Sequence, residues 1–234
     1  MLLRQQVRSV FRDRFSGLLV VLPLVLTAIP VLVLPILREV LAERIGFDLH
    51  PHFPAIKAVM VMVIPFLLGL CFAFLLIDER DRGIFETIQI TPSGLERYLA
   101  ARLLLPLGLS FVYSLLLLPV FLSGDRSGNQ LFWSATIAAL ECPLWALMIL
   151  AFSRNKVGAM AVGKGMTLLA MVPVVSLYVP PPSGLLFAGF PTYWLFRAFI
   201  DPEFSEGAWP LPGVALHLWL IFRFWRRSIR RAEP

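Results

Sequence analysis

Charged side chains are scarce in this 234-residue chain, where Asp, Glu, Lys and Arg together make up 15% of the residues. A soluble globular domain usually carries about 25%. Hydrophobic residues reach 58%, and many of them are gathered in long stretches. Because a stretch of roughly 18 or more apolar residues is typical of a membrane-spanning helix, the composition excludes an ordinary soluble domain. It predicts an all-α integral membrane protein.

Cysteine and histidine are also rare, with two and three copies in the chain. Cys71 and Cys142 both lie inside apolar stretches, so we expect neither a structural disulfide nor a cysteine-based zinc site. The segment DLHPH holds Asp48, His50 and His52. Two histidines on a proline-containing loop are more typical of plain surface than of a metal site, and we expect no metal site in this chain.

Six apolar stretches predict six transmembrane helices within a single domain, residues 1–234. The stretches are residues 17–37, 55–77, 103–122, 131–152, 157–179 and a shorter one at 211–225. The first is too long for the apolar part of a signal peptide, and no small-residue cleavage motif follows it. We therefore expect the first stretch to stay in the membrane as a span.

The basic residues near the ends of the stretches predict the orientation, because cytoplasmic loops carry an excess of Lys and Arg. With the N-terminus inside, fifteen Lys and Arg residues lie on the inner side and five on the outer side. Both termini are therefore expected in the cytoplasm. The formal net charge of +6 follows from this topology, and no nucleic-acid partner is expected.

Three short segments look like parts of an ATPase: GAMAVGKG at residues 158–165, FLLIDE at 74–79 and LSGD at 122–125. A phosphate-binding loop follows a strand and needs Ser or Thr after its lysine. Here Gly165 occupies that position, and the segment opens an apolar stretch. The acidic segment precedes the loop instead of following it, and LSGD falls in a predicted outer loop. We therefore expect this chain not to bind ATP by itself.

The segment at residues 158–165 is better interpreted as a helix-packing surface. Ala159 and Gly163 are small residues four positions apart, and so are Ala161 and Gly165. Such pairs let helix backbones approach closely in lipid. The segment therefore predicts a close contact between helices.

Glu141 and Lys164 are charged residues well inside predicted spans, away from the ends. Such residues usually face protein or water, and they often mark a substrate path. Three interpretations stay open. The two residues could form an ion pair, each could be a polar point on a substrate path, or Lys164 could extend to the inner surface of the membrane.

The segment between the second and third stretches, residues 78–102, predicts a helical hairpin in the cytoplasm. It reads DERDRGIFETIQITPSGLERYLAAR. Asp78, Arg82 and Glu86 are spaced four residues apart. On a helix this spacing places them on one face, where oppositely charged neighbours form favourable ion pairs. Pro92 is expected to end this first helix. A Ser-x-x-Glu capping box directly after it starts the second helix, which continues into the third span.

This hairpin resembles the E-R-E-x-G…P pattern in the first cytoplasmic loop of ABC-2-type exporter permeases. The residues that match are Glu79, Arg80, Gly83, Glu86 and Pro92. Asp81 stands where the family usually has Glu, Ile84 departs from its common Thr or Ser, and Arg102 replaces its frequent Lys. The resemblance extends over the whole chain, including the number of spans and the position of both termini.

The resemblance implies a transmembrane permease subunit of an ATP-binding-cassette exporter, paired with a second permease as a homo- or heterodimer. Separate ATPase subunits, which carry ATP and magnesium, would dock on the hairpin, and no residue of this chain would be catalytic. The residues expected to take part in ATPase coupling are Glu79, Arg80, Asp81, Arg82, Gly83, Glu86, Thr91 and Pro92. The protein would be a multi-pass protein of a prokaryotic plasma (inner) membrane, in contact with lipid.

Two further segments fit the same family. Residues 1–16 have an apolar face opposite an arginine face, which predicts an interfacial helix lying on the membrane. The resemblance implies that it is the elbow helix, which contacts the ATPase. Residues 180–210 are too short and interrupted to span twice, and their aromatic residues favour an interfacial or re-entrant pair of half-helices. The resemblance implies that this segment closes the outer end of the path.

The short length and the ETIQITP segment resemble small fluoroquinolone or multidrug export permeases, which implies a hydrophobic or amphipathic cargo, drug or lipid-like. Alternatives stay open. A stand-alone secondary transporter or a membrane anchor could use Glu141 and Lys164, although no internal repeat supports such a transporter. An intramembrane hydrolase with Ser183 and His217 as a dyad would need its nucleophile seated inside the helix bundle.

Overall fold

The computed structural model of the chain describes residues 14–92, 94–121, 127–180 and 182–231, with side chains from residue 21 on except those of residues 23, 26 and 27. All regular structure in these ranges is helical. The α-helices and 3₁₀ helices (η) are, in chain order, α2 (Arg14–Ile45), η1 (His50–His52), α3 (Phe53–Asp81), α4 (Ile84–Gln89), α5 (Gly94–Phe121), α6 (Gly128–Phe152), α7 (Lys156–Met171), η2 (Val172–Leu177), η3 (Ser183–Phe187), α8 (Pro191–Ile200), α9 (Pro202–Glu206) and α10 (Pro210–Arg230). The prediction of an all-α protein is confirmed for the described residues.

Four helical segments of the described chain are long and apolar enough to cross a membrane. They are His50–Asp81, Gly94–Phe121, Gly128–Phe152 and Lys156–Leu177, which correspond to the second to fifth predicted spans. A hydrocarbon core about 30 Å thick needs about 20 helical residues, and each segment exceeds that length. α2 and α10, where the sequence predicts the first and sixth spans, are not among these four, so the count of six stays a prediction.

Helix α6 forms the centre of the bundle and packs against α3, α5, α8 and α10. In its most apolar stretch 78% of the residues are buried, against 28% in α5 and in the segment formed by α7 and η2. Small side chains on α6, such as Ala135, Ala138 and Ala146, are fully buried and let the neighbouring helices approach. α6 is therefore surrounded by protein, whereas α5 and α7 keep exposed faces.

Two glycines allow the closest helix contacts. A Cβ atom on Gly69 of α3 would lie 2.6 Å from Cβ of Trp145 and 2.7 Å from the carbonyl oxygen of Cys142, both on α6. A Cβ atom on Gly213 of α10 would lie 2.7 Å from Cβ of Trp194 on α8. Real Cβ atoms do not approach other heavy atoms so closely, so any larger residue would push these helices apart.

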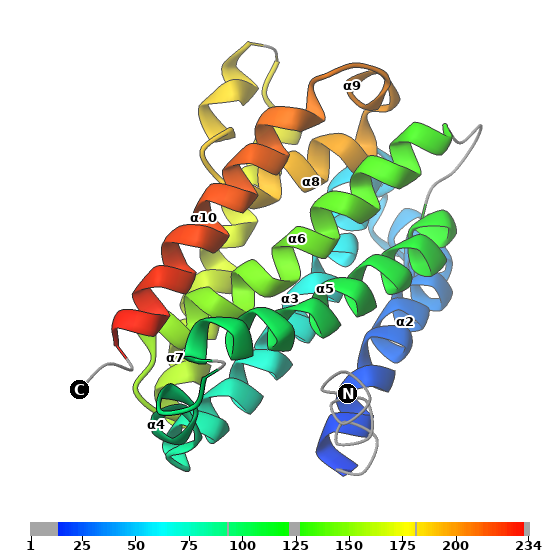
Figure 1. Ribbon diagram of the computed structural model, residues 1–234. Helices are drawn as coiled ribbons and strands as arrows, with labels where there is room; N and C mark the ends of the chain where they lie inside the picture. Colours follow the sequence, from blue (N-terminus) through cyan, green and yellow to red (C-terminus); the bar gives the residue numbers. More distant parts are fainter. Residues whose placement is uncertain (1–13, 93, 122–126, 181, 232–234) are drawn as a thin grey trace.

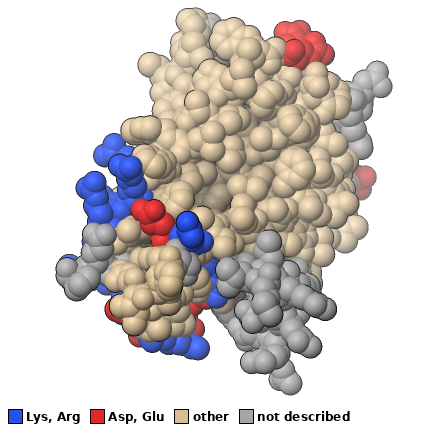
Figure 2. Space-filling model, viewed as in Figure 1, with Lys and Arg blue, Asp and Glu red and all other residues tan. Residues whose placement is uncertain are grey.

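The bundle has two distinct ends (Figure 1). α4, the start of α7 and the end of α10 lie at one end, which we call the α4 end, and η3, α8 and α9 lie at the other, the α9 end. In Figure 2 the coloured charged atoms gather mainly at the α4 end, while the flank between the two ends is almost entirely uncharged. An uncharged flank is what contact with lipid requires, because charged side chains are costly within the bilayer.

Residues 180–210 form short helices at the α9 end. Tyr193, Trp194 and Phe196 of α8 are buried. The Gln130 side-chain amide donates a hydrogen bond to the carbonyl of Phe199 at 2.7 Å, which ties α8 to α6. The short helices agree with the predicted interruption of this segment, and re-entry into the membrane stays a prediction.

Candidate functional site

Gly83 separates the end of α3 from α4. It has φ +73°, a left-handed conformation that glycine adopts without strain. The prediction of one continuous helix through Asp78, Arg82 and Glu86 is therefore wrong. Asp78 and Arg82 do form an ion pair, with 2.7 Å between their charged atoms, but Glu86 belongs to the next helix.

Helix α4 is short but anchored to the bundle. It packs between α3 and α5, and the ring of Phe85, which is 1% exposed, lies edge-on to the ring of Tyr98. α4 ends at Gln89 with Ile90 as its C-cap, two residues before Pro92, which agrees with the prediction that the helix stops at this proline. Ser93, the first residue of the predicted capping box, lies outside the described residues.

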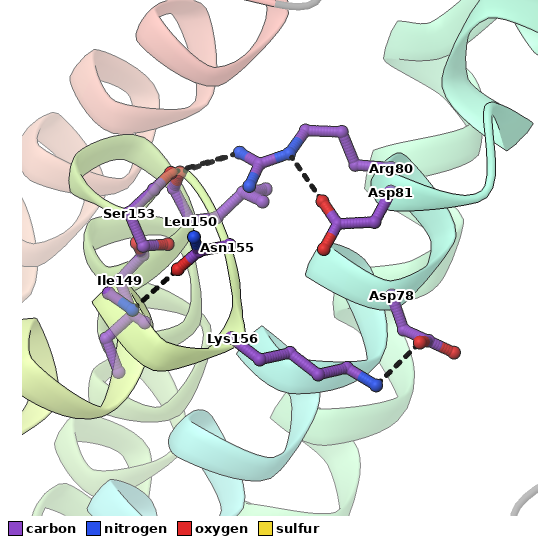
Figure 3. Close-up of polar contacts among 9 residues, drawn as sticks. Asp78, Arg80, Asp81, Ile149, Leu150, Ser153, Asn155 and Lys156 are labelled. Carbon is purple, nitrogen blue, oxygen red and sulfur yellow. Dashed lines mark hydrogen bonds and ion pairs between the residues drawn. The ribbon is translucent and has the colours of Figure 1, made fainter.

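Asp78 links the end of α3 to the start of α7. The Nζ atom of Lys156 lies 2.6 Å from Oδ1 of Asp78, and in the close-up of Figure 3 the Lys156 side chain points toward this carboxylate. Arg82 pairs with the other carboxylate oxygen. Asp78 thus has a cation on each oxygen, one from its own helix end and one from α7.

Arg80 links α3 to the last turn of α6 (Figure 3). Its Nη1 atom donates hydrogen bonds to the carbonyls of Ser153 at 3.2 Å and Leu150 at 3.5 Å. The last carbonyls of a helix have no partner within the helix and carry the negative end of its dipole. The guanidinium therefore caps α6, and with 19% of its side chain exposed it faces the bundle more than solvent.

Glu79 links α3 to α5 through an ion pair with Arg102. Both side chains are largely buried, at 12% and 22% exposure, and Arg102 also donates to the hydroxyl of Tyr98 at 3.2 Å. Sequence reasoning missed Arg102 and Lys156 as partners of the hairpin acids. Their position at the inner ends of neighbouring predicted spans was the available signal.

The eight predicted coupling residues therefore separate into three groups. Glu79 and Arg80 point into the bundle and join helices, and Gly83 forms the bend. The exposed residues are Asp81, Arg82, Glu86, Thr91 and Pro92. Ile90 lies among the exposed residues, with 86% of its surface accessible, and sequence reasoning did not single it out.

Glu141 is enclosed in the bundle. It has no exposed surface, the Trp145 indole donates to its Oε2 atom at 3.4 Å, and its Oε1 atom lies 3.9 Å from Nε2 of His217 on α10. Nδ1 of His217 lies 2.7 Å from the carbonyl oxygen of Gly213. A carbonyl only accepts, so Nδ1 carries a hydrogen and Nε2 faces Glu141. Lys164 is exposed on α7, and the two predicted path residues are not brought together.

The segment at residues 158–165 lies inside α7, where its backbone is helical and not an open loop. Ala159 and Gly163 are buried, and a Cβ atom on Gly163 would lie 3.3 Å from the end of the Leu70 side chain on α3. This agrees with the packing interpretation for the first small-residue pair. Ala161 and Gly165 are exposed on the opposite face of α7.

The hydrolase dyad and the metal site that were considered from the sequence are not formed by the described residues. Ser183 is exposed on η3, whereas His217 is fully buried against Gly213 and Glu141. Asp48 accepts a hydrogen bond from the backbone of His50 at 2.9 Å. Within the described ranges, no three His, Cys, Asp or Glu residues are grouped as a metal site.

Two predicted segments fall outside the described residues. Most of the elbow helix, residues 1–13, and the LSGD segment, 122–125, are among them. Residues 14–16, the end of the predicted elbow, belong to the start of α2.

Comparison with known proteins gives consistent matches. The model of the family described as "Fluoroquinolones export permease protein Rv2686c-like" matches residues 6–225. Two relatives from Mycobacterium tuberculosis are named fluoroquinolones export permease protein: MT2760 of strain CDC 1551 / Oshkosh and Rv2686c of strain ATCC 25618 / H37Rv. Each is 27% identical over 237 residues, covering 95% of this chain and 92% of the relative. No solved structure matches the chain.

Proposed function

Because this chain belongs to the Rv2686c-like family of fluoroquinolones export permease proteins, we propose that it is the transmembrane permease subunit of an ATP-binding-cassette exporter. In this proposal it pairs with a second permease, identical or paralogous, and with separate ATPase subunits that carry ATP and magnesium. The cargo is a hydrophobic or amphipathic small molecule, and the relatives' names favour a fluoroquinolone. The chain itself performs no bond-breaking chemistry.

The observation that carries the proposal is the attachment of the α3–α4 junction to three other helices, α5, α6 and α7. α4 packs on α3 and α5. The end of α3 is joined to α5 by Glu79, to α6 by Arg80 and to α7 by Asp78. A surface element held in this way moves together with the bundle. An ATPase that docked on α4 and closed on nucleotide would therefore tilt the bundle and alternate access to the path.

The exposed residues around α4 supply a docking surface of mixed chemistry. Arg82 and Glu86 offer charges, and Ile90 offers an exposed apolar side chain in their midst. An apolar contact surrounded by polar groups is the usual composition of a protein interface. The charged residues serve docking, and the buried pairs behind them transmit the movement.

The proposed membrane arrangement has six spans, with α2 and α10 as the first and last, in a prokaryotic plasma membrane. The start of α2 and the end of α10 lie toward the α4 end in Figure 1, which supports termini on the same side. Arg223, Arg226, Arg227 and Arg230 lie in the last two turns of α10, and cytoplasmic ends are enriched in such residues. The α4 end is then cytoplasmic, and residues 180–210 close the path at the outer end.

A stand-alone secondary transporter is the second candidate. The observation that favours it is the buried pair of Glu141 and His217, since carboxylate and imidazole groups inside a membrane often serve as proton relays. In that case drug movement would follow a proton gradient and would need no ATPase.

The test is drug transport in inverted membrane vesicles, with this chain produced alone or together with the ATPase encoded beside its gene. We expect norfloxacin uptake only when both are present and ATP is supplied, together with ATP hydrolysis that is absent from the chain alone. Uptake by the chain alone that a proton ionophore abolishes would establish the secondary transporter instead. If no ATPase co-purified and no norfloxacin uptake occurred, the membrane anchor would be the remaining alternative.

A further inference from the structure

A groove of 520 Å³ lies along the C-terminal part of α10, lined by two aromatic rings and five arginine side chains. Its volume falls within the range of about 300–1,000 Å³ that ligand pockets occupy. In Figure 2 blue atoms gather over this end of α10. The proposed docking of an ATPase on α4 does not account for this concentration of charge. The arginines, all of them exposed, are Arg223, Arg226, Arg227, Arg230 and Arg231.

Few carboxylates are placed to neutralise these arginines. None of the five forms an ion pair with another described residue. α10 packs mainly against α6 and α8, whose one acidic residue, Glu141, is enclosed in the bundle beside His217. The sequence after Arg231 adds a single acidic residue, Glu233, and one carboxylate cannot neutralise five guanidinium groups. The groove therefore favours a ligand with negative charge.

Aromatic rings of α10 itself hold two of the guanidinium groups. The Arg223 guanidinium lies 5.4 Å from the centre of the Trp219 ring, and that of Arg226 lies 4.5 Å from the centre of the Phe222 ring. Both distances are within the limit of about 6 Å for a cation–π contact. These contacts restrict two long side chains, so their donors are arranged before an anion arrives.

The face of α10 that carries these arginines is apolar earlier in the helix. In the proposed arrangement α10 runs toward the cytoplasmic end, so the apolar part lies at the depth of the acyl chains and the arginines lie at the level of the headgroups. An acidic protein surface would match only the arginines, whereas an anionic phospholipid matches both parts. The exposed apolar residues of this face, spaced as on one side of a helix, are Leu211, Ala215, Leu218, Trp219 and Phe222.

We propose that this groove binds an anionic phospholipid, whose phosphate is met by Arg223 and Arg226 and whose acyl chains lie along the exposed apolar face. The inference rests on the proposed function for the side of the membrane, which places the lipid in the cytoplasmic leaflet. α10 is not among the described segments that are apolar enough to cross a membrane by composition. A lipid that neutralises its arginines lowers the cost of their charge at the membrane surface and holds the end of α10 there.

The experiment titrates the purified chain in detergent with phosphatidylglycerol and counts bound lipids by native mass spectrometry, which gives the Kd of the tightest-bound lipid. We expect Arg223→Gln and Arg226→Gln each to raise this Kd about fivefold, and the double variant about twenty-fivefold, as expected for basic residues beside an anionic headgroup. Phosphatidylcholine, whose headgroup has no net charge, should bind weakly and equally to all forms. Arg154→Gln is the matched control, because Arg154 is an exposed residue between α6 and α7 and lies outside the groove.

An unchanged Kd in the double variant overturns the proposal. An equal rise in Kd for Arg154→Gln also overturns it, because the effect would then come from the net charge and not from the groove. If the double variant bound phosphatidylglycerol normally but lost the co-purifying ATPase, the groove would belong to the ATPase interface instead. Arg223 and Arg226 are exposed, so the variants should fold, and either single variant decides the question if the double variant does not.

This outcome is separable from that of the proposed function, because lipid binding is measured without an ATPase. Arginine-dependent binding of phosphatidylglycerol without any ATP-driven uptake would keep the site and remove the exporter. Normal ATP-driven uptake by a double variant whose lipid binding is also unchanged would keep the exporter and remove the site.

Discussion

Glu141 and His217 face each other inside the bundle, with 3.9 Å between Oε1 and Nε2 and no exposed surface on either residue. Because Nδ1 of His217 is committed to the carbonyl of Gly213, the ring orientation is fixed and Nε2 points at α6. The separation is longer than a hydrogen bond, and neither Oε1 of Glu141 nor Nε2 of His217 has a hydrogen-bond partner among the described residues, so the two side chains form a contact between α6 and α10. It ties α10 to the central helix at a place where unpaired polar groups are costly.

Replacing one member of this pair should destabilise the protein more than replacing both. His217→Leu takes away the imidazole that faces the Glu141 carboxyl group, and leaving a buried polar group without a polar neighbour costs about 1–3 kcal/mol. The double variant Glu141→Leu with His217→Leu removes both polar groups, so much of the stability should return. Unfolding midpoints in mixed micelles measure the difference. A double variant no more stable than His217→Leu would mean that the pair is not the cause.

The contact between α3 and α6 should tolerate no side chain at Gly69. Gly69→Ala places a methyl group within 2.7 Å of the backbone oxygen of Cys142, and such overpacking costs about 1–3 kcal/mol. Gly108→Ala on α5 is the matched control, because a Cβ atom there meets nothing within 4 Å. This control should be neutral or slightly stabilising, since alanine favours a helix over glycine. Equal unfolding midpoints for the two variants would contradict the close contact.

The all-α fold class could be predicted from the sequence, because an apolar stretch of this length crosses a membrane as an α-helix. The helix break at Gly83 was not, since the charge spacing of Asp78, Arg82 and Glu86 fits a continuous helix equally well. A single glycine signals a possible bend without saying whether it is used.

The partners of the candidate residues could not be predicted from sequence either. Glu79 and Arg80 were expected to be docking residues because they match the family pattern in the predicted cytoplasmic hairpin. Their actual partners, Arg102 and the carbonyls of α6, become visible only when the helices are assembled. The same holds for Glu141, whose partner His217 lies on a helix far away in sequence.

Gly165→Ser completes the consensus of a phosphate-binding loop but should not create nucleotide binding. Residues 158–165 lie within α7, so most of their backbone N–H groups are committed to helical hydrogen bonds and cannot surround a phosphate. Gly165 is exposed, and a Cβ atom there meets nothing within 4 Å, so the fold should be unaffected. Equilibrium dialysis with labelled ATP on the purified variant is the measurement. Saturable binding would contradict the helical assignment.

Arg80 should matter as a donor and not only as a charge. Arg80→Leu removes its bonds to the carbonyls of Ser153 and Leu150, and hydrogen bonds of a charged group contribute about 1.5–3 kcal/mol. We expect faster amide hydrogen exchange in the last turn of α6 and the start of α7. Arg80→Lys keeps the charge but lacks the planar fork of donors, so it should rescue the protection only in part. Full rescue by lysine would show that charge alone suffices.

Glu79 and Glu86 should have separable effects, although the family pattern treats them alike. Glu79 pairs with Arg102 behind the surface, so Glu79→Gln should lower stability by about 1–3 kcal/mol and weaken the transmission of ATP-driven movement. Glu86 is exposed, so Glu86→Lys should leave the unfolding midpoint unchanged. It should weaken ATPase association by about 1 kcal/mol, roughly fivefold in Kd. Unfolding midpoints and co-purification, measured on both variants, separate the two roles. If Glu86→Lys bound the ATPase normally, the docking surface would lie elsewhere than on α4, and Ile90 would be the next residue to replace, because its exposed apolar side chain would then have no assigned partner.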